Sequence, residues 1–572
     1  MPIGWLAMKR MPSVGLSPSA PTELPAPPVA PALTLRGRRR QRSTSWRDFP
    51  HIVRWASHGL VWIALLVPMV SELARGWRPD SDNAAIAARA YQSLSLHPPL
   101  VGMTTVAGNG HVLFDPGPLM FYLLAVPVHL DPSRGLFWGA TLLCGAVLSL
   151  AIEAAWSAGL WVAGAVVAFT TLDLLWLTPT VFENMAWNAY FPVPFFMAAV
   201  VLAWVVALGR VRWWPVLVFV ASVAAQSHLT FVIPSVVLTL TALIFGLHAA
   251  RLRHLGWLIT GVGVGLVCWL APLVQEVGRG RGNLSALARP DGRGAILGFS
   301  FGLRWLGAAG SLHPLWLTHL PTGFFPVLGL EYAHAPWFGG LIIALLLCIT
   351  AAALATGRRE LGALGAIALA AAVSEMASFA VFPAGNLLNL SYLINSLWVL
   401  SILIWSVVVW AAVSIGLWVW HRYREDVRLP IVPNSRPCVE RLAPAGMVLS
   451  LAVLAVLAVI GFLGLKPAAT DPSDIYFMPQ MAARDARAAL AIEQLVKPGR
   501  VAIVVATRSR DGFLAPGTAE GVAYRLKVDG WRPGLRSPLG FSSGFTIPPR
   551  QHWPTFLITL TGSRGLSVTR VR

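Results

Sequence analysis

Charge is scarce in this chain: 12% of its 572 residues are charged, whereas 56% are hydrophobic. A soluble domain carries about 25% charged residues, so half of the usual charge is missing. This shortage excludes a soluble enzyme, a disordered scaffold and a nucleic-acid-binding protein. The chain also lacks the runs of about ten residues with alternating polarity that form a membrane β-barrel. Apolar runs of about 20 residues recur instead, which predicts an all-α polytopic membrane protein.

Cysteine is scarce as well, with four residues in the chain. Cys144, Cys268 and Cys348 lie inside apolar runs, Cys438 lies in a basic loop, and no pair has the spacing of metal ligands. We interpret all four as structural or incidental. The sequence also lacks a Walker motif, a His/Glu metal pair on a helix and a Gly-x-Ser-x-Gly elbow. The chemistry of the protein must therefore be sought in less common patterns.

The net charge of +19 is concentrated at the two ends of the chain, with +7 in residues 1–54 and +8 in residues 466–572. We expect these ends to contact anionic membrane lipids and phosphate-bearing lipids, with no nucleic acid as a partner. Residues 1–50 are rich in proline and then in arginine, which predicts a disordered, basic cytoplasmic tail. No apolar stretch follows the first charges directly, so we do not interpret this segment as a signal peptide.

The apolar runs predict a transmembrane domain at residues 51–465 with about eleven spans. A shorter run at 117–130 contains Pro118 and Pro127 and is interpreted as an interfacial helix. The spans are placed at 55–75, 134–155, 158–178, 190–208, 213–226, 228–248, 255–275, 337–356, 361–382, 391–418 and 445–465.

Basic residues predict the orientation of these spans. With the N-terminus in the cytoplasm, the short outer loops at 179–189, 227 and 383–390 contain no lysine or arginine, as the positive-inside rule requires. The cytoplasmic loops contain the pairs Arg210/Arg212, Arg251/Arg253 and Arg358/Arg359 and the cluster from Arg422 to Arg441. We therefore expect a multi-pass protein of the bacterial cytoplasmic membrane whose C-terminus is extracytoplasmic.

Three longer segments then face outward: the loops 76–133 and 276–336 and the tail 466–572. Long segments are translocated largely regardless of their charge, so the basic ones do not contradict this orientation. The tail predicts a small extracytoplasmic α/β domain. Its expected elements are helices at 480–497 and 518–528 and strands at 501–506 and 555–561.

The most informative polar residues lie in the first outward loop. Asp80-Ser81-Asp82-Asn83 follows the first span, then come Pro99-Leu100-Val101-Gly102 and Asp115-Pro116-Gly117-Pro118-Leu119. Later segments continue the series: Trp187-Asn188, Gln226-Ser227-His228, Pro272-Leu273-Val274-Gln275 and Gly282-Asn283-Leu284. This ordered set resembles the GT-C-type membrane glycosyltransferases, and more narrowly the actinobacterial cell-envelope enzymes related to arabinofuranosyl- and mannosyltransferases. The resemblance covers about residues 55–420, and the tail matches more loosely.

The resemblance implies that a sugar is transferred from a polyprenyl-phosphate donor to an acceptor on the outer face of the membrane. A carboxylate of the first outward loop then acts as the base on the acceptor hydroxyl. Asp82 matches this base by position, and Asp80 is the alternative. Both also suit the cap of a helix that starts at Asn83. Their Asp-x-Asp spacing is also that of a metal site, so a divalent cation is the one cofactor left open, and no metal ligand is assigned.

Other residues are candidates for binding rather than for proton transfer. Asp115 stands where the related enzymes have histidine before Pro-Gly-Pro, so it orients the acceptor or caps the interfacial helix. The resemblance places Trp187 and Asn188 on the acceptor side of the cavity. We assign Glu183 to the same cavity, because intramembrane carboxylates are costly and usually face a cavity or a partner. The guanidinium group of arginine can donate two parallel hydrogen bonds to two oxygens of one phosphate. The candidates for the donor phosphate are His228, Gln275, Arg279, Arg281, Asn283 and Arg289.

We therefore expect an inverting membrane glycosyltransferase whose acceptor is a glycan, lipid or protein of the cell envelope. The alternative is a transporter or flippase of a lipid-linked saccharide, which would use the same basic cavity and many spans. Transporters often contain internal repeats with matched broken helices, and the sequence has no such repeat. The arginines of the second outward loop also suit a basic loop that contacts lipid headgroups.

Overall fold

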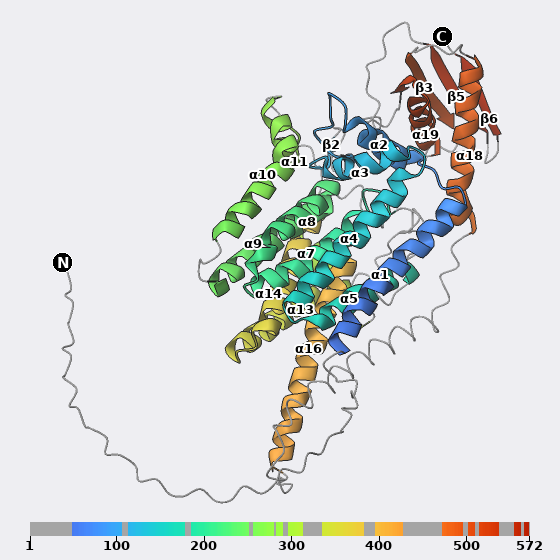
Figure 1. Ribbon diagram of the computed structural model, residues 1–572. Coiled ribbons are helices and arrows are strands. Elements are labelled where there is room, and N and C mark those ends of the chain that lie inside the picture. Colours follow the sequence, from blue (N-terminus) through green and yellow to red (C-terminus); the bar gives the residue numbers. More distant parts are fainter. Residues whose placement is uncertain are drawn as a thin grey trace, which may run out of the picture. The chain divides into compact units, whose positions relative to one another are not determined.

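The structure, a computed structural model, describes most of the chain from residue 49 onward (Figure 1). The predicted tail at 1–50 lies almost wholly outside the described residues. These are 49–105, 113–177, 185–250, 255–278, 282–289, 296–312, 335–382, 395–426, 472–495, 502–509, 514–536, 554–561 and 565–570.

Helices form most of the described structure, and seven of them are long and apolar enough to cross a membrane. This finding supports an all-α membrane protein, as the composition predicts. The seven helical stretches are Pro50–Ala74, Gly135–Ser157, Leu229–Ala249, Leu255–Gly278, Pro336–Ala355, Arg359–Ala380 and Asn395–Trp420.

Helices also lie at three further predicted spans, but these helices are short. They are α5 (Trp161–Leu177), α7 (Pro192–Ala207) and α8 (Trp214–Ser227). At about 1.5 Å per residue, the 14 residues of α8 extend about 21 Å, less than the thickness of about 30 Å of the hydrocarbon core. The last predicted span, 445–465, lies outside the described residues. The count of eleven spans therefore stays a prediction.

The long helices differ in how much of their surface the protein itself covers. All but one residue of α7 are buried, so α7 lies in the core, against α4 (Gly135–Ser157), α8 and α9 (Val232–Ala250). By contrast, α10 (Leu255–Gly278) exposes large apolar side chains such as Val267 and Val277. Exposed apolar side chains on a membrane-length helix suit lipid, so we expect α10 to face the bilayer. The remaining long helices are α1 (Phe49–Ala74), α13 (Pro336–Ala355), α14 (Arg359–Ala380) and α16 (Asn395–Asp426).

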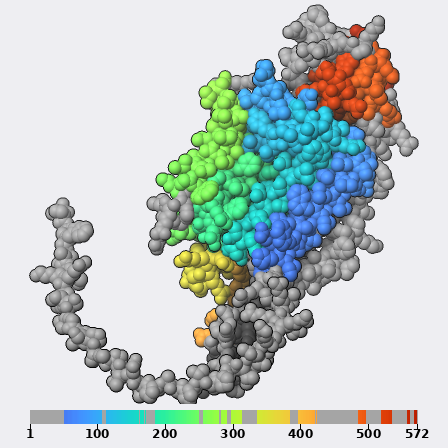
Figure 2. All heavy atoms as spheres, viewed as in Figure 1, coloured from blue at the N-terminus to red at the C-terminus, as the bar shows by residue number. Residues whose placement is uncertain are grey.

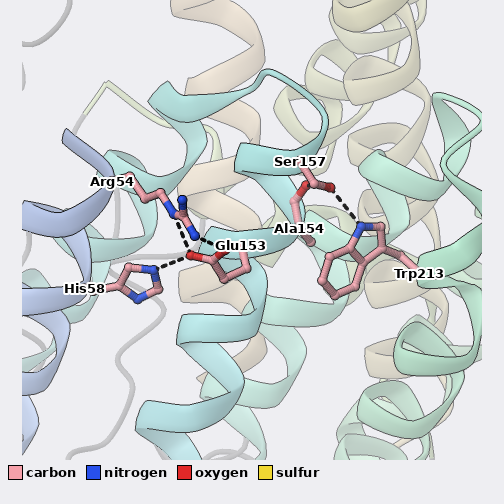
Figure 3. A network of polar contacts seen from close by, with 6 residues as sticks. All are labelled: Arg54, His58, Glu153, Ala154, Ser157 and Trp213. Atoms are coloured by element: carbon pink, nitrogen blue, oxygen red, sulfur yellow. Dashed lines mark hydrogen bonds and ion pairs between the residues drawn. The ribbon is translucent and has the colours of Figure 1, made fainter. Parts of the chain in front are cut away.

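One end of the bundle is fastened by a polar network that Figure 3 shows from close by. On α1, the Arg54 guanidinium donates to both oxygens of Glu153 on α4, at 2.8 and 2.6 Å, and His58 Nε2 lies 2.7 Å from the same carboxylate. Near the same end, Trp213 of the short helix η1 (Val211–Trp213) donates to the Ser157 hydroxyl at 2.9 Å. By the predicted orientation this is the cytoplasmic end.

The first loop forms a compact cap at the opposite end. It contains the helices α2 (Ser81–Gln92) and α3 (Leu119–Leu130) and the short antiparallel pair β1 (Thr104–Thr105) and β2 (Leu113–Phe114). The alanine-rich sequence of α2 favours a helix, and its small side chains allow close packing. All residues from Asn83 to Ala90 are buried, with α3 and the C-terminal helix α19 (Leu514–Val528) packed against α2.

The C-terminal unit is a four-stranded sheet with two helices. The strand order is β4-β3-β5-β6, in which β3 is parallel to β4 and β5, and β6 is antiparallel to β5. Ala488 and Ile492 of α18 pack with Val522 and Leu526 of α19 and with Phe556 of the sheet. The bounds of these elements are α18 (Pro472–Leu495), β3 (Ala502–Ser509), β4 (Arg532–Arg536), β5 (Thr555–Thr561) and β6 (Gly565–Arg570).

The C-terminal unit rests on the first loop (Figure 2). Tyr524 of α19 donates from its hydroxyl to the Pro132 carbonyl at 2.6 Å. Ala523 and Tyr524 belong to the same buried apolar cluster as the helices of the bundle. The apolar core therefore continues from the bundle through the first loop into the C-terminal helices.

Candidate functional site

The two glycine-containing stretches of the first loop pack directly on each other. Backbone hydrogen bonds join Gly102 N to Asp115 O at 3.0 Å and Asp115 N to Met103 O at 2.7 Å. A Cβ atom on Gly102 would lie 2.7 Å from the Asp115 Cβ, and one on Gly117 would lie 2.0 Å from Gln226 Oε1. Glycine is thus needed where the chain passes Asp115 and where it meets α8.

Asp115 is a buried junction of three segments of the chain. Its side chain accepts hydrogen bonds from Asn188 Nδ2 and from the backbone N–H of Leu229, both at 3.0 Å. The N-cap position of α3 is Pro118, and among the described contacts no side chain caps that helix. The helix-cap interpretation of Asp115 is therefore wrong. Asp115 fastens the loop to the chain before α7 and to the turn between α8 and α9.

Asn283 fastens the second outward loop to the same place. It begins the short helix α11 (Asn283–Ala288), donates from Nδ2 to the Phe114 carbonyl at 2.9 Å, and accepts from Phe114 N at 3.0 Å. Its own N–H donates to Gln275 Oε1 at 2.9 Å. Of the residues predicted to bind the donor, Asn283 thus holds the backbone of β2 next to Asp115, and Gln275 holds Asn283.

The turn between α8 and α9 carries the predicted His228. Its Nδ1 lies 2.8 Å from the Thr230 hydroxyl and 3.4 Å from Thr230 N. Because the backbone N–H can only donate, Nδ1 is the acceptor and the ring proton is placed on Nε2. Ser378 of α14 donates to the Thr230 carbonyl at 3.2 Å. The turn that holds His228 is therefore braced by α14.

The start of α16 reaches this end of the bundle as well. Asn395 Nδ2 donates to the carbonyl of Ala189, the residue after Asn188, at 3.2 Å. Ser396 donates to Glu375, a carboxylate that is 1% exposed within α14. Glu375 therefore anchors the first turn of α16 beside the segment that supplies Asn188.

Asp80 and Asp82 lie at the start of α2, which begins two residues earlier than the sequence predicts. Asp80 holds the N-cap position but makes no cap hydrogen bond with the described residues, and it is 2% exposed. Asp82 remains partly exposed and accepts a hydrogen bond from Trp187 Nε1 at 2.9 Å. Capping thus does not explain either carboxylate.

Ser81, between these two aspartates, has a φ angle of +44°. Positive φ is uncommon outside glycine and stores strain that the surrounding structure must offset. Such strain gathers at functional sites. The backbone therefore supports a functional interpretation of Asp80 and Asp82 independently of their charges.

Burial raises the pKa of each of the three loop carboxyls. The pKa of Asp80 is raised to about 7, by burial first and then by the negative charge of Asp82. The pKa of Asp82 is raised by burial and lowered again by the hydrogen bond from Trp187. The pKa of Asp115 is raised well above its usual range by burial, against its bonds from Asn188 and Leu229. Asp82, which keeps contact with solvent, is the carboxylate best placed to exchange a proton with a substrate.

Three charged residues near Asp80 and Asp82 were not predicted from the sequence. Asp485 and Arg484 of α18 and Glu520 of α19 are 4%, 5% and 2% exposed, and the charge of Asp82 acts on Glu520. Arg484 and Asp485 share a helix face with the buried Ala488, and Glu520 shares one with the buried Ala523 and Tyr524. A charge on an apolar helix stripe is the signal that could have found them.

Four predicted site residues remain: Glu183, Arg279, Arg281 and Arg289. Glu183, Arg279 and Arg281 lie outside the described residues, and Arg289 is exposed at the end of α11. A basic phosphate site in the second outward loop therefore stays a prediction. Among the described residues, no group of three histidine, cysteine, aspartate or glutamate side chains is placed to hold a metal ion.

Comparison with known proteins identified no relative of this chain. No protein-family model, curated protein or solved structure matches the chain.

Proposed function

We propose that the protein is a membrane glycosyltransferase that moves a sugar from a polyprenyl-phosphate donor to an acceptor of the cell envelope. The observation that carries this proposal is Asp82: a partly exposed carboxylate at one end of a membrane bundle, held by Trp187, whose neighbour Asn188 binds Asp115. The resemblance to GT-C enzymes supplies the reaction type. The geometry around Asp82 supports the assignment of this residue as the general base.

In this mechanism Asp82 removes the proton from the acceptor hydroxyl as that oxygen attacks the anomeric carbon of the donor. A new carbon–oxygen bond forms on one face of the sugar while the bond to the phosphate oxygen breaks on the other. The phosphate leaves with the electron pair as an anion and needs no general acid. The anomeric configuration is therefore inverted.

The arrangement of the helices is compatible with an outward-facing site. The candidate residues follow helices that run in one direction or precede helices that run in the other, so they lie at the same end of the bundle. They are Asp80, Asp115, Asn188, His228 and Asn283. α16 starts at that end and runs away from it, whereas the C-terminal unit lies at it (Figure 1). This is the arrangement that the predicted span 445–465 requires. We propose that this end is extracytoplasmic.

The test is transfer of labelled sugar in liposomes that contain the purified protein, a set of decaprenyl-phosphate donors and an envelope extract as acceptor. We expect wild type to transfer label and Asp82→Ala to be inactive although folded. Asp131→Asn is the matched control, because Asp131 is a carboxylate of the same loop whose described side-chain hydrogen bonds come from Ser133 and from the backbone N–H of Arg134. If intact lipid-linked saccharide crosses the bilayer and no sugar is transferred, the protein is a flippase and the proposed enzyme activity is wrong.

A further inference from the structure

The interface between α2 and the C-terminal helices is tightly packed. Besides the bond from Tyr524 to the Pro132 carbonyl, Lys527 Nζ donates to the Ala88 carbonyl on α2 at 3.5 Å. On the α18 side, a Cβ atom on Gly521 would lie 1.8 Å from Asp485 Oδ2. The Asp485 carboxyl therefore lies against the backbone of α19, next to Glu520.

Carboxyl groups are buried in this interface with little compensation. Asp80 Oδ2 and Glu520 Oε1 have no hydrogen-bond partner among the described residues, and neither has Arg484 Nε. Arg484 is the cation whose charge acts on both Asp80 and Asp485. A buried carboxylate without a partner is costly, and in practice such a group stays protonated instead.

We infer that Glu520 of α19 and Asp485 of α18 are positioning residues for Asp82, so that the site is complete only when the C-terminal unit is docked on α2. This inference rests on the proposed role of Asp82. The two tail residues do not touch the reacting atoms. They hold α19 over the start of α2 and so fix the surroundings of the base.

The titratable groups at the interface make the docking of the C-terminal unit depend on pH. Burial raises the pKa of Glu520 and of Asp485 well above the usual range, and the nearby charges of Asp82 and Asp80 raise them further. Carboxyls with a raised pKa favour the docked state while they are protonated. Docking is therefore strongest below about pH 4, the pKa of a free carboxyl. It weakens as the pH rises towards the pKa values of the carboxyls in the docked state, and the pKa of Asp80 in that state is about 7.

The basic groups of the same interface act in the opposite direction at higher pH. Burial lowers the pKa of Lys527 to about 8 and that of Arg89 on α2 to about 10. Their loss of charge favours docking only above those values. Burial also raises the pKa of Tyr524, which keeps its proton throughout. The effect of the carboxyls on docking can therefore be measured between about pH 5 and about pH 8, below the range in which Lys527 and Arg89 lose their charge.

Hydrogen exchange of the full chain in lipid nanodiscs measures docking without any assumption about the reaction. We expect the protection of α2 and α19, corrected for intrinsic exchange, to fall by up to about tenfold per pH unit for each proton lost. The Asp485→Asn/Glu520→Gln variant carries amides that stay neutral, so its protection is expected to depend less on pH, with Asp80 accounting for the dependence that remains. Asp529→Asn, directly after the end of α19, is the control, because Asp529 is exposed and pairs with Arg525.

Transfer activity over the same range gives the second measurement. The alkaline limb of the wild-type profile is expected to move to higher pH in the neutral variant, whereas the acid limb, set by Asp82, stays. If the double variant does not fold, Asp485→Asn alone is compared. Equal pH dependence of protection in variant and wild type would overturn the inference. Normal pH-linked docking without any transfer would instead overturn the proposed function.

Discussion

Trp187 Nε1 donates a hydrogen bond to Asp82 Oδ2 at 2.9 Å, between residues that lie 105 positions apart in the chain. The bond joins the first loop to the segment before α7. It also acts on the proposed base, since it lowers the pKa of Asp82 against the effect of burial. Position and protonation of Asp82 thus depend on one indole.

Replacement of Trp187 by phenylalanine tests this relationship. The bond to the ionised carboxylate is lost, so the pKa of Asp82 rises and the acid limb of the transfer profile moves to higher pH. Because one pKa unit is about a tenfold change in the ionised fraction, we expect a loss of about three- to tenfold at pH 6 and much less at pH 8. An unshifted acid limb in a folded Trp187→Phe variant would argue against Asp82 as the titrating base.

The Asp115 junction is testable through stability. Asp115→Ala leaves Asn188 Nδ2 and Leu229 N buried without their acceptor, which costs about 3 kcal/mol. We expect a clear fall in the unfolding temperature of the detergent-solubilised protein. In a double-mutant cycle with Asn188→Ala, the two losses should be less than additive, because both variants remove the same bond. Additive losses would show that the two side chains do not interact.

Gly102→Ala tests the close approach of the loop to Asp115. The added methyl would meet the Asp115 Cβ at 2.7 Å and the Gly117 carbonyl at 2.9 Å, and neither can move freely. We expect a loss of about 2 kcal/mol, as for an overpacked core. Gly59→Ala on α1 is the matched control, because its Cβ meets nothing within 4 Å. Alanine there should stabilise the helix by about 0.5–1 kcal/mol. Equal effects at both positions would contradict the packing.

The orientation of the bundle is tested by cysteine labelling in a cysteine-free background. Leu96, which is 95% exposed in the first loop, lies at the proposed outer end. Thr356 lies at the turn between α13 and α14, beside the basic pair Arg358/Arg359. A membrane-impermeant maleimide is expected to label Leu96→Cys in intact cells and Thr356→Cys only after permeabilisation. The reverse pattern would place the site in the cytoplasm.

Much of the helical framework could be predicted, because long apolar runs have few alternatives to a helix in a membrane. The separate short helix predicted within residues 117–130 is confirmed as α3, Leu119–Leu130, and its position at the membrane interface stays a prediction. The loop motifs identified Asp115, Asn188 and Asn283 as polar residues of interest, but they did not predict that hydrogen bonds join their segments. Their roles could not be predicted, since the partner of a carboxylate depends on tertiary contacts such as the Leu229 N–H.

The tail contribution escaped prediction for a different physical reason. Asp485 and Glu520 lie in helices whose apolar stripe already accounts for packing on the sheet through Ala488 and Val522. Only the docking of α19 on α2 brings their charges near Asp80 and Asp82. Long-range contacts of this kind, such as the one between Pro132 and Tyr524, which are 392 positions apart, leave no periodic signal in the sequence.

The central claim is that Asp82 is the base of a sugar transfer, and its most direct measurement is the rate of transfer by Asp82→Asn, which keeps the shape of the side chain. With purified protein, a labelled decaprenyl-phosphate sugar and saturating acceptor, we predict a loss of about 10²- to 10⁴-fold relative to wild type. Asp131→Asn should stay near the wild-type rate. Transfer by folded Asp82→Asn at the wild-type rate would contradict the account.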